Sequence, residues 1–434
     1  PDHQIELKST RHGPVISENS LGTRAISFKY TSTAGINRGF EALIPQMTAS
    51  SISEADQAME KWVDPCNNYM FVDVEGDIQY LNRGQVPVRS FDNAWLPVPG
   101  WTGEHEWEGN IPFGEMPRSI NPKNGFLVTA NNKIIGDQFP YYMALDYAPE
   151  FRAKRIVERV KGLDKATVED MVSIHSERTS IPASVYVPHL LNLDNLNSLQ
   201  VQAQASLKNW TYEMDPDSIS ATVYSVFRWK LHLKVIGSLL GSLADQALVS
   251  GGRGAPTHIS HLAIRLLEGL KSEDSSLLPD GETWDTIISR AFIEGVEYLR
   301  QTIGPDLEDW VWGKLHYTKP THTLSEIFSN HKDLLNPPSV PMGGDGDTPQ
   351  AGSFALSNPF VMTGMSVARY VFDPSDWDNS RWIVPLGSSG HPGSSHYSDQ
   401  TALWSKVEVI KMAYTTKAVQ EISVSQQKLT PLIK

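Results

Sequence analysis

The chain has 434 residues, a formal net charge of −13 at pH 7, 40% hydrophobic residues and 20% charged residues. Its length predicts two or three modules or one large core, and its composition is ordinary for a globular protein. The acidic charge argues against a nucleic-acid partner, because an acidic surface repels phosphates. No apolar run approaches the length that spans a bilayer. The single cysteine, Cys66, excludes an internal disulfide and a multi-cysteine zinc site.

The first eighty or so residues predict short strands and one helix. Alternating or apolar runs indicate strands at residues 4–8, 15–16, 24–30, 68–74 and 77–81, and the last two form a hairpin. Ser51, with Glu54 three positions later, predicts a capping box that opens a helix. A long loop rich in Pro, Gly and Trp follows at 87–117, and its length favours a packed or functional segment over a free linker.

The stretch 119–158 combines two chemically useful groups. An apolar run at 125–130 predicts a strand that ends at the adjacent amides Asn131 and Asn132, and the following helix carries Arg152. An asparagine amide at a strand end can donate a hydrogen bond to a developing oxyanion, although such a pair more often simply starts a turn. An arginine near a helix start opposes the helix dipole, so Arg152 either orients another group or belongs to a solvent-facing cationic cluster.

The rest of the chain predicts a helical middle and a β-rich end. Helices are predicted at 167–178, 185–193, 195–208, 218–242, 257–271 and 283–302, and strands at 365–372, 381–386 and 406–414. The sequence therefore predicts an α+β protein with three parts. These are a β-rich part at 1–160, a mainly helical insertion at 161–335 and a β-rich return at 336–434.

Three further sets of polar residues are weaker candidates. The loop 390–400 contains Ser, His and Asp, but neighbouring loop residues seldom form a triad, and the G-x-S-x-G elbow is missing. Asp345 and Asp347, with their glycines, match an acidic calcium loop only in part. The histidines lack zinc-like spacing.

Several short motifs resemble, in the same order, those of the penicillin acylase family of N-terminal-nucleophile (Ntn) hydrolases. That family includes penicillin G acylases, cephalosporin acylases and N-acyl-homoserine lactone acylases. The motifs are Arg11–Ile16, Leu96–Gly100, Asn121–Asn132 with its Asn-Pro and Ala-Asn-Asn pairs, Trp310–His316, Gly343–Gly346 and Ser389–Gln400. Each motif alone is weak, but their common order is specific, and the resemblance covers essentially the whole chain.

The resemblance implies an Ntn-hydrolase αββα sandwich, present in part, with a large helical insertion. It also implies an amide hydrolase that removes the acyl chain from an N-acylated small molecule, such as a β-lactam or an N-acyl-homoserine lactone. In the family, an N-terminal nucleophile activated by its own α-amino group takes the acyl chain and passes it to water. Asn131 corresponds to the oxyanion-binding amide, Arg152 to the supporting arginine, and Tyr69 to an aromatic that borders the acyl pocket.

The resemblance carries expectations about partners and ions as well. The family nucleophile lies well upstream of the Arg11–Ile16 motif, so we expect this chain to be a β-subunit fragment that is inactive alone. The expected partners are the α subunit and the N-terminal part of the β subunit. No cofactor is required for the chemistry, but structural calcium occurs in the family, and Asp137 is the candidate ligand. A periplasmic or secreted location is also implied.

An acylase-like scaffold that binds its ligand in an aromatic pocket without catalysis is the alternative to an enzyme. The residue at the self-cleavage site of the full-length gene discriminates between the two, because an enzyme needs Ser, Thr or Cys there. A carbohydrate-binding role rests only on the Trp-rich loop and is the weaker third possibility.

Overall fold

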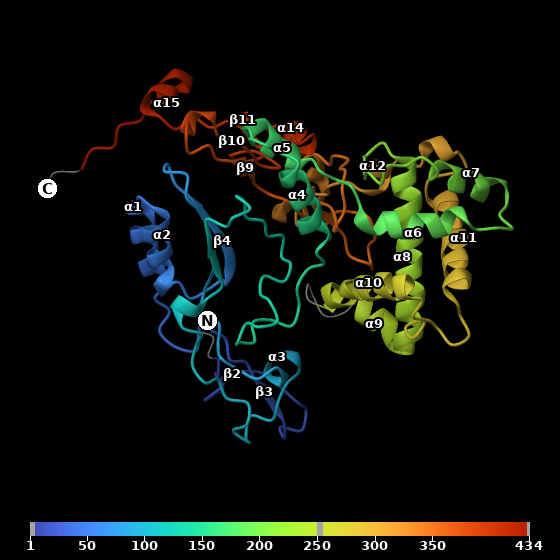
Figure 1. Cartoon of the computed structure of the whole chain (residues 1–434), viewed down its shortest axis with the longest axis horizontal. Coiled ribbons are helices and arrows are strands. Elements are labelled where there is room, and N and C mark those ends of the chain that lie inside the picture. The colour runs from blue at the N-terminus through green and yellow to red at the C-terminus, as the bar shows by residue number, and fades with distance from the viewer. Residues whose placement is uncertain (1–4, 250–254, 432–434) are drawn as a thin grey trace. The chain divides into compact units, whose positions relative to one another are not determined.

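The computed structural model describes residues 5–249 and 255–431 and divides the chain into two compact units (Figure 1). Unit 1 comprises residues 1–148 and unit 2 comprises residues 149–434. Both helices and antiparallel sheets are present, so the predicted α+β class is confirmed. The helical middle and the C-terminal strands share unit 2, and the predicted three-part division stays a prediction.

Unit 1 contains two small antiparallel sheets with the strand orders β1-β2-β3 and β4-β5-β6. The strands are β1 (Ser9–Thr10), β2 (Gly13–Glu18), β3 (Ala25–Ser27), β4 (Asn67–Val72), β5 (Ile78–Arg83) and β6 (Arg118–Ile120). The helices are η1 (Gly39–Ala42), α1 (Leu43–Thr48), α2 (Ile52–Ala58), η2 (Met59–Lys61), α3 (Asp92–Trp95) and η3 (Phe113–Glu115), where η denotes a 3-10 helix. The predicted β4–β5 hairpin is confirmed, and its register pairs Tyr69 with Leu81.

The core of unit 1 lies on one face of the β4-β5-β6 sheet. Met59 and Leu81 are fully buried there, and Tyr69 and Phe71 pack against them. Helix α2 covers this face, and Ser51 caps it by accepting a hydrogen bond from the Glu54 N–H at 3.2 Å. The second half of the predicted capping box is wrong, because the Glu54 carboxylate accepts from Ser50 instead.

Two predicted strands of unit 1 are wrong. Residues 5–8 are irregular, and Gln4 lies outside the described residues. Residues 125–130 are also irregular, although their apolar pattern suits a strand. The third strand of the sheet is β6, which pairs Ser119 with Tyr80. A local apolar run does not reveal whether a strand elsewhere in the chain will pair with it.

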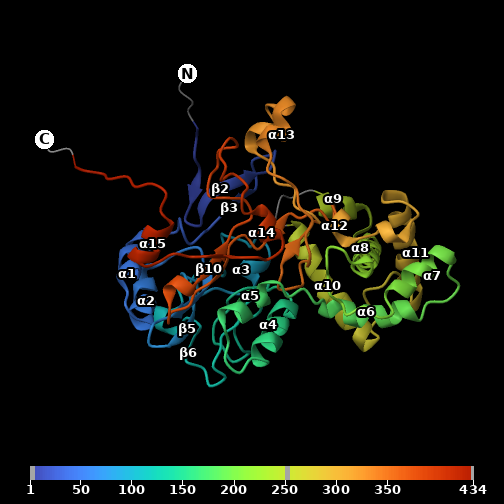
Figure 2. The same cartoon turned by 90° about the horizontal axis from the view of Figure 1, so that it is seen from above.

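Unit 2 begins with helices that match the prediction closely. They are α4 (Phe151–Lys161), α5 (Val168–His175), α6 (Ile181–Leu191), α7 (Ser198–Ser206), α8 (Ile219–Leu240), η4 (Gly241–Leu243), α9 (Ala244–Val249), α10 (Ala255–Ser272), α11 (Trp284–Thr302), η5 (Leu307–Asp309), α12 (Trp312–Leu315), η6 (Thr323–Ser325), η7 (Ser329–His331) and α13 (Lys332–Leu335). Helices α8 and α11 pack along each other in both views (Figures 1 and 2). Their apolar faces, with Phe227 and Phe292, form the centre of the largest core.

The C-terminal part of unit 2 forms shorter strands than the sequence predicts. The elements are β7 (Gly352–Ser353), β8 (Gly364–Met365), β9 (Arg369–Val371), η8 (Trp377–Asn379), β10 (Arg381–Ile383), α14 (Thr401–Ser405), β11 (Ile410–Lys411) and α15 (Thr416–Ile422). They form a β7-β8 pair and a β11-β10-β9 sheet, both antiparallel. Pro374 and Pro385 follow β9 and β10 closely, and proline cannot donate to a ladder.

Among the helices of the described residues, none has both the length and the apolar character needed to cross a bilayer.

Candidate active site

Asn131 lies at a turn in unit 1 whose backbone requires an unusual residue. Its φ is +63°, in the left-handed region that asparagine tolerates better than most residues. The Asn131 carbonyl accepts a hydrogen bond from the Ala148 N–H at 2.8 Å. The neighbouring Asn132 accepts from the Ala130 N–H and donates to the Lys133 carbonyl, both at 3.0 Å. Asn132 therefore provides side-chain bonds of the turn, while the Asn131 side chain is exposed.

The irregular segment before Asn131 is fixed to the sheet by polar side chains. Asn68 on β4 donates to the Thr129 hydroxyl at 3.0 Å and accepts from the Tyr80 hydroxyl at 2.6 Å. Asn82 on β5 also donates to Asn68, at 3.2 Å. Burial raises the pKa of Tyr80, so its hydroxyl remains a donor. These bonds give the segment a defined place without a strand ladder.

Arg152 lies in the first turn of α4, in unit 2, and is half-buried between the buried residues Phe151 and Ala153. Burial lowers the pKa of its guanidinium, and the negative charge of Asp347 opposes that effect. Asn131 and Arg152 belong to different units.

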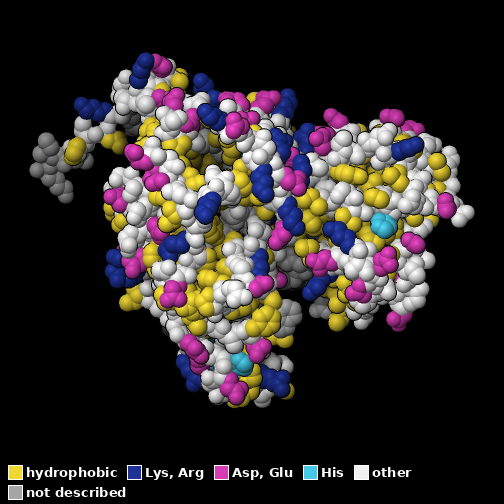
Figure 3. Space-filling view, in the orientation of Figure 1, with side chains coloured by type: hydrophobic (Ala, Val, Ile, Leu, Met, Phe, Trp, Pro, Cys, Tyr) yellow, Lys and Arg dark blue, Asp and Glu magenta, His cyan; other side chains and the backbone are white. Residues whose placement is uncertain are grey.

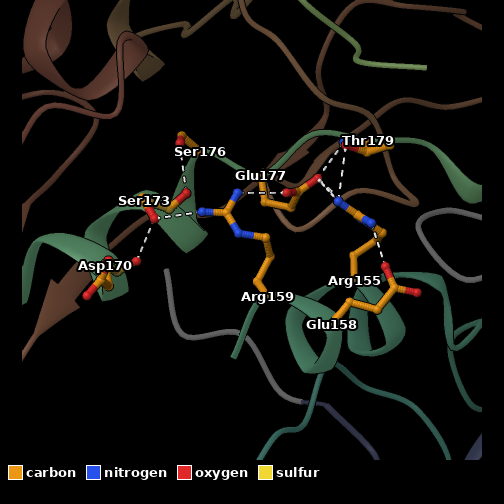
Figure 4. A network of polar contacts seen from close by, with 8 residues as sticks. All are labelled: Arg155, Glu158, Arg159, Asp170, Ser173, Ser176, Glu177 and Thr179. Carbon is orange, nitrogen blue, oxygen red and sulfur yellow. Dashed lines mark hydrogen bonds and ion pairs between the residues drawn. The ribbon is translucent and has the colours of Figure 1, made fainter. Parts of the chain in front are cut away.

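Helix α4 is held in place by a network centred on Glu177 (Figure 4). The Glu177 side chain is only 5% exposed, and its two oxygens lie 3.1 Å from Arg155 Nη2 and 3.0 Å from Arg159 Nη1. The Thr179 N–H donates to the same carboxylate at 2.9 Å. Burial alone would raise the pKa of Glu177, but the Thr179 hydrogen bonds and the Arg155 charge outweigh it, so the pKa is lowered.

The spacing of the arginines places Arg152 on the same face of α4 as the two arginines that bind Glu177. Arg152, Arg155 and Arg159 are three and four positions apart, so they lie on one face of α4. The Glu177 backbone carbonyl also accepts from the Gln350 N–H at 2.7 Å. Glu177 thus fixes both α4 and the loop that carries Asp347.

The acidic loop at 343–347 forms an ion pair rather than a recognisable metal site. Asp347 Oδ2 lies 2.6 Å from Arg228 Nη1 on α8, and the Asp347 N–H donates to Asp345 at 2.8 Å. Burial, together with the Asp347 charge, raises the pKa of Asp345 to about 6. The Arg228–Asp347 pair cannot be recognised in the sequence, because no local pattern joins residues so far apart along the chain.

Tyr69 points to the core face of its sheet and is surrounded by side chains. The Arg83 guanidinium lies 4.3 Å from the centre of its ring, and Phe71 makes an edge contact at 4.7 Å between ring centres. Gln46 on α1 contacts the Tyr69 hydroxyl. The place of Tyr69 in an acyl pocket rests on the resemblance alone.

Asp137 does not show the surroundings of a calcium ligand. Its side chain is 90% exposed, and Lys133 Nζ lies 2.8 Å from its carboxylate. In the described part of the chain, no group of three or more His, Cys, Asp or Glu side chains could hold a metal ion. These residues do not fit calcium by themselves, and the calcium assignment stays a prediction from the resemblance.

The loop 390–400 contains a His–Asp pair without a triad. His396 Nδ1 lies 2.7 Å from Asp399 Oδ2, and both side chains are partly or largely exposed. Among the described residues, no serine hydroxyl hydrogen-bonds to the His396 ring. The Tyr397 hydroxyl donates to the Leu335 carbonyl at 2.5 Å, which fixes the loop to α13.

Comparison with solved structures gives the class of the fold. The structure superposes on a thermostable penicillin G acylase from Alcaligenes faecalis with a TM-score of 0.68 and 19% identity, covering 100% of this chain and 80% of that chain. The chain therefore has the Ntn-hydrolase fold of that enzyme, which confirms the predicted fold.

Sequence comparison gives the family. The Penicillin amidase family profile matches residues 1–421, so the chain belongs to the penicillin amidase family. The penicillin acylase 2 proenzyme of Pseudomonas sp. (strain SE83) is 36% identical over 99% of this chain and 54% of its own length. The acyl-homoserine lactone acylase QuiP of Pseudomonas fluorescens (strain Pf-5) is 22% identical over 93% of this chain and 51% of its own. The chain thus spans about half the length of these curated relatives.

Proposed function

We propose that the full-length protein is an acylase that hydrolyses the amide bond of an N-acylated small molecule. Membership of the penicillin amidase family is the observation that carries this proposal. The names of the relatives support two substrate classes, penicillins and acyl-homoserine lactones. A hydrophobic pocket discriminates between acyl chains by only about 1–3 kcal/mol per methylene group. We therefore propose the substrate class without a chain length.

The proposed reaction uses a nucleophile from the part of the protein outside the match. Its hydroxyl or thiol attacks the amide carbonyl, and its α-amino group takes the proton and then passes it to the leaving amine. Water hydrolyses the resulting acyl-enzyme. Asn131 donates its side-chain N–H to the oxyanion, and its fixed backbone favours this role because a preorganised donor needs no reorganisation during the reaction. Arg152 orients the site.

The experiment is amide hydrolysis by the processed full-length protein, with penicillins and acyl-homoserine lactones as substrates. Asn131→Ala is expected to lower kcat by about 100- to 1,000-fold, as for other oxyanion donors. Asn132→Ala is the comparison for damage to the turn, because it removes the side-chain bonds to Ala130 and Lys133 and leaves the Asn131 amide in the protein. If the folded protein hydrolyses no acylated amide, the enzyme proposal fails and a non-catalytic binding role replaces it.

We also propose that the rest of the full-length protein covers an exposed apolar stripe of unit 1. Phe40, Ile44 and Met47 follow at helical spacing along η1 and α1, and they are 86%, 74% and 84% exposed. Hydrophobic side chains are spread among charged ones over the face in Figure 3. A contiguous patch of exposed apolar side chains commonly marks an interface. Hydrogen exchange should then be slower at α1 in the full-length protein than in residues 1–434 alone, and equal rates would contradict the proposal. A periplasmic or secreted location remains part of the same proposal.

A further inference from the structure

The first turn of helix α4 carries Arg152, but no side chain caps its start. The residue before the helix is Glu150, and its side chain makes no capping hydrogen bond. Helix ends fray, because their first N–H groups have no partner within the helix. Phe151 and Ala153 are buried and hold this turn by apolar contacts, which have no preferred direction. What fixes the rotation of α4 therefore lies further along the helix.

Two arginines of the following turns bind one buried carboxylate (Figure 4). Glu177 Oε1 lies 3.1 Å from Arg155 Nη2, and Glu177 Oε2 lies 3.0 Å from Arg159 Nη1. Arg159 Nη2 also donates to the Ser173 hydroxyl at 2.9 Å. Charge-assisted hydrogen bonds from a planar guanidinium are strongly directional, so these contacts define the rotation of α4 about its axis. Arg152 lies on the same face, three positions before Arg155.

The main chain of Glu177 holds a second segment that bears on Arg152. Its carbonyl accepts from the Gln350 N–H at 2.7 Å. Asp347, three residues before Gln350, lies 2.6 Å from Arg228 on α8. Burial lowers the pKa of Arg152, and the negative charge of Asp347 opposes that change. Glu177 therefore connects the helix that carries Arg152 with the loop whose charge acts on it.

A buried carboxylate is a costly way to join these segments if stability is its only effect. Taking the charge out of water costs desolvation energy, and well-packed apolar side chains often join helices at least as stably. The Glu177 side chain is only 5% exposed, and it needs the Thr179 N–H at 2.9 Å as well as the two arginines. Apolar contacts would not supply the direction that these bonds give.

We propose that Glu177 is the positioning residue for Arg152. Its side chain sets the rotation of α4, and its main chain holds the loop with Asp347, so that the Arg152 guanidinium keeps one orientation. This inference rests on the proposed function, in which Arg152 orients the active site.

The test uses the processed full-length protein and an amide that the wild type hydrolyses, below the melting temperature of every variant. Glu177→Gln is expected to lower kcat by about 10- to 100-fold, because a displacement of about 1 Å in an active site costs up to that much. Arg159→Met removes one arm of the same support at a smaller cost in stability, since Arg159 is 39% exposed. It should give a smaller loss in kcat, and it replaces Glu177→Gln if that variant does not fold.

A double-mutant cycle with Arg152→Lys separates positioning from a general loss of stability. Lysine lacks the planar fork that Glu177 orients, so in this background Glu177→Gln should lower kcat by about twofold or less. The fall in melting temperature caused by Glu177→Gln should be similar in both backgrounds. If the fold-loss in kcat is also equal in both, Glu177 acts through stability alone and the proposal is wrong.

Glu158→Gln is the matched control. Glu158 lies on α4 itself and is a second carboxylate partner of Arg155, at 2.5 Å, but it is 57% exposed. Exposed ion pairs contribute little, so kcat should stay within about twofold of the wild type. A loss as large as that of Glu177→Gln would show a general effect of charge and would overturn the proposal.

Crystal structures of the full-length wild type and of Glu177→Gln decide the question independently of activity. We expect α4 to be rotated in the variant and the Arg152 guanidinium to be displaced by about 1 Å or more. If Arg152 superposes in the two structures, the proposal is wrong. If the wild type hydrolyses no acylated amide, the proposed function fails, and this structural comparison alone decides on Glu177.

Discussion

The turn at Asn131 and the helix with Arg152 place their functional side chains by different physical means. Asn131 follows an irregular segment, and single hydrogen bonds to Ala148 and around Asn132 fix its backbone. Arg152 lies on a regular helix that a buried carboxylate, Glu177, binds through two arginines. Damage to the turn should therefore act locally, whereas damage to the helix support should spread through unit 2.

The largest effect on stability should come from the helix support. Glu177→Gln leaves Arg155 and Arg159 without their shared counter-charge. Breaking a buried ion pair lowers the free energy of unfolding by about 3–5 kcal/mol. Because both arginines are partly exposed, we expect a loss at the lower end of this range, about 3 kcal/mol. Chemical denaturation of residues 1–434 measures it. Lys234→Met is the control, because its partner Glu294 is half-exposed and its removal should cost about 1 kcal/mol or less.

The pH dependence sharpens the same prediction. The pKa of Glu177 is lowered from its ordinary value of 4.5, so its stabilisation is present above that pH and is lost as the pH falls through the lower folded pKa. The difference between wild type and Glu177→Gln should accordingly shrink below about pH 4. A difference that stays constant down to pH 3 would show that the carboxylate charge is not what holds α4.

Asp345 should change the stability with pH in the opposite direction to Glu177. Its folded pKa is raised from 3.8 to about 6, so the folded state binds the proton more tightly and stability falls as the pH rises from about 4 to about 6. Asp345→Asn should remove that fall, which amounts to about 2–3 kcal/mol, and should be the more stable protein at pH 7. Melting temperatures across this range test it. If the stability of the wild type and the stability of Asp345→Asn change by the same amount over this pH interval, the assignment is wrong.

The smallest expected effect is at the helix after α4. Thr167 caps α5 in a complete capping box with Asp170, and Thr167→Ala should cost about 1 kcal/mol. Ser51→Ala is the comparison in unit 1, because the Ser51 cap lacks the reciprocal bond and should cost less. A larger loss for Ser51 would show that the reciprocal bond contributes nothing.

Helices were the part of the fold that the sequence predicted best. The apolar faces of α8 and α11 are local patterns, so the predicted helices at 218–242 and 283–302 are present in the structure. The segment 125–130 was predicted wrongly because strand pairing depends on partners elsewhere in the chain, which a local apolar run does not reveal. The motif containing Asn131 was visible in the sequence. The Glu177 network and the Arg228–Asp347 pair were not, since their members come together only in the fold.

Asn131→Gly in the full-length protein tests the role of Asn131 most directly. Glycine adopts a φ of +63° readily, so this variant keeps the turn while it removes the side-chain amide. If Asn131 donates to the oxyanion, Asn131→Gly should lose about 100- to 1,000-fold in kcat, as Asn131→Ala does, although glycine keeps the backbone of the turn. If Asn131→Gly retains the activity of wild type while Asn131→Ala loses stability, the residue serves only the turn and the oxyanion assignment is wrong.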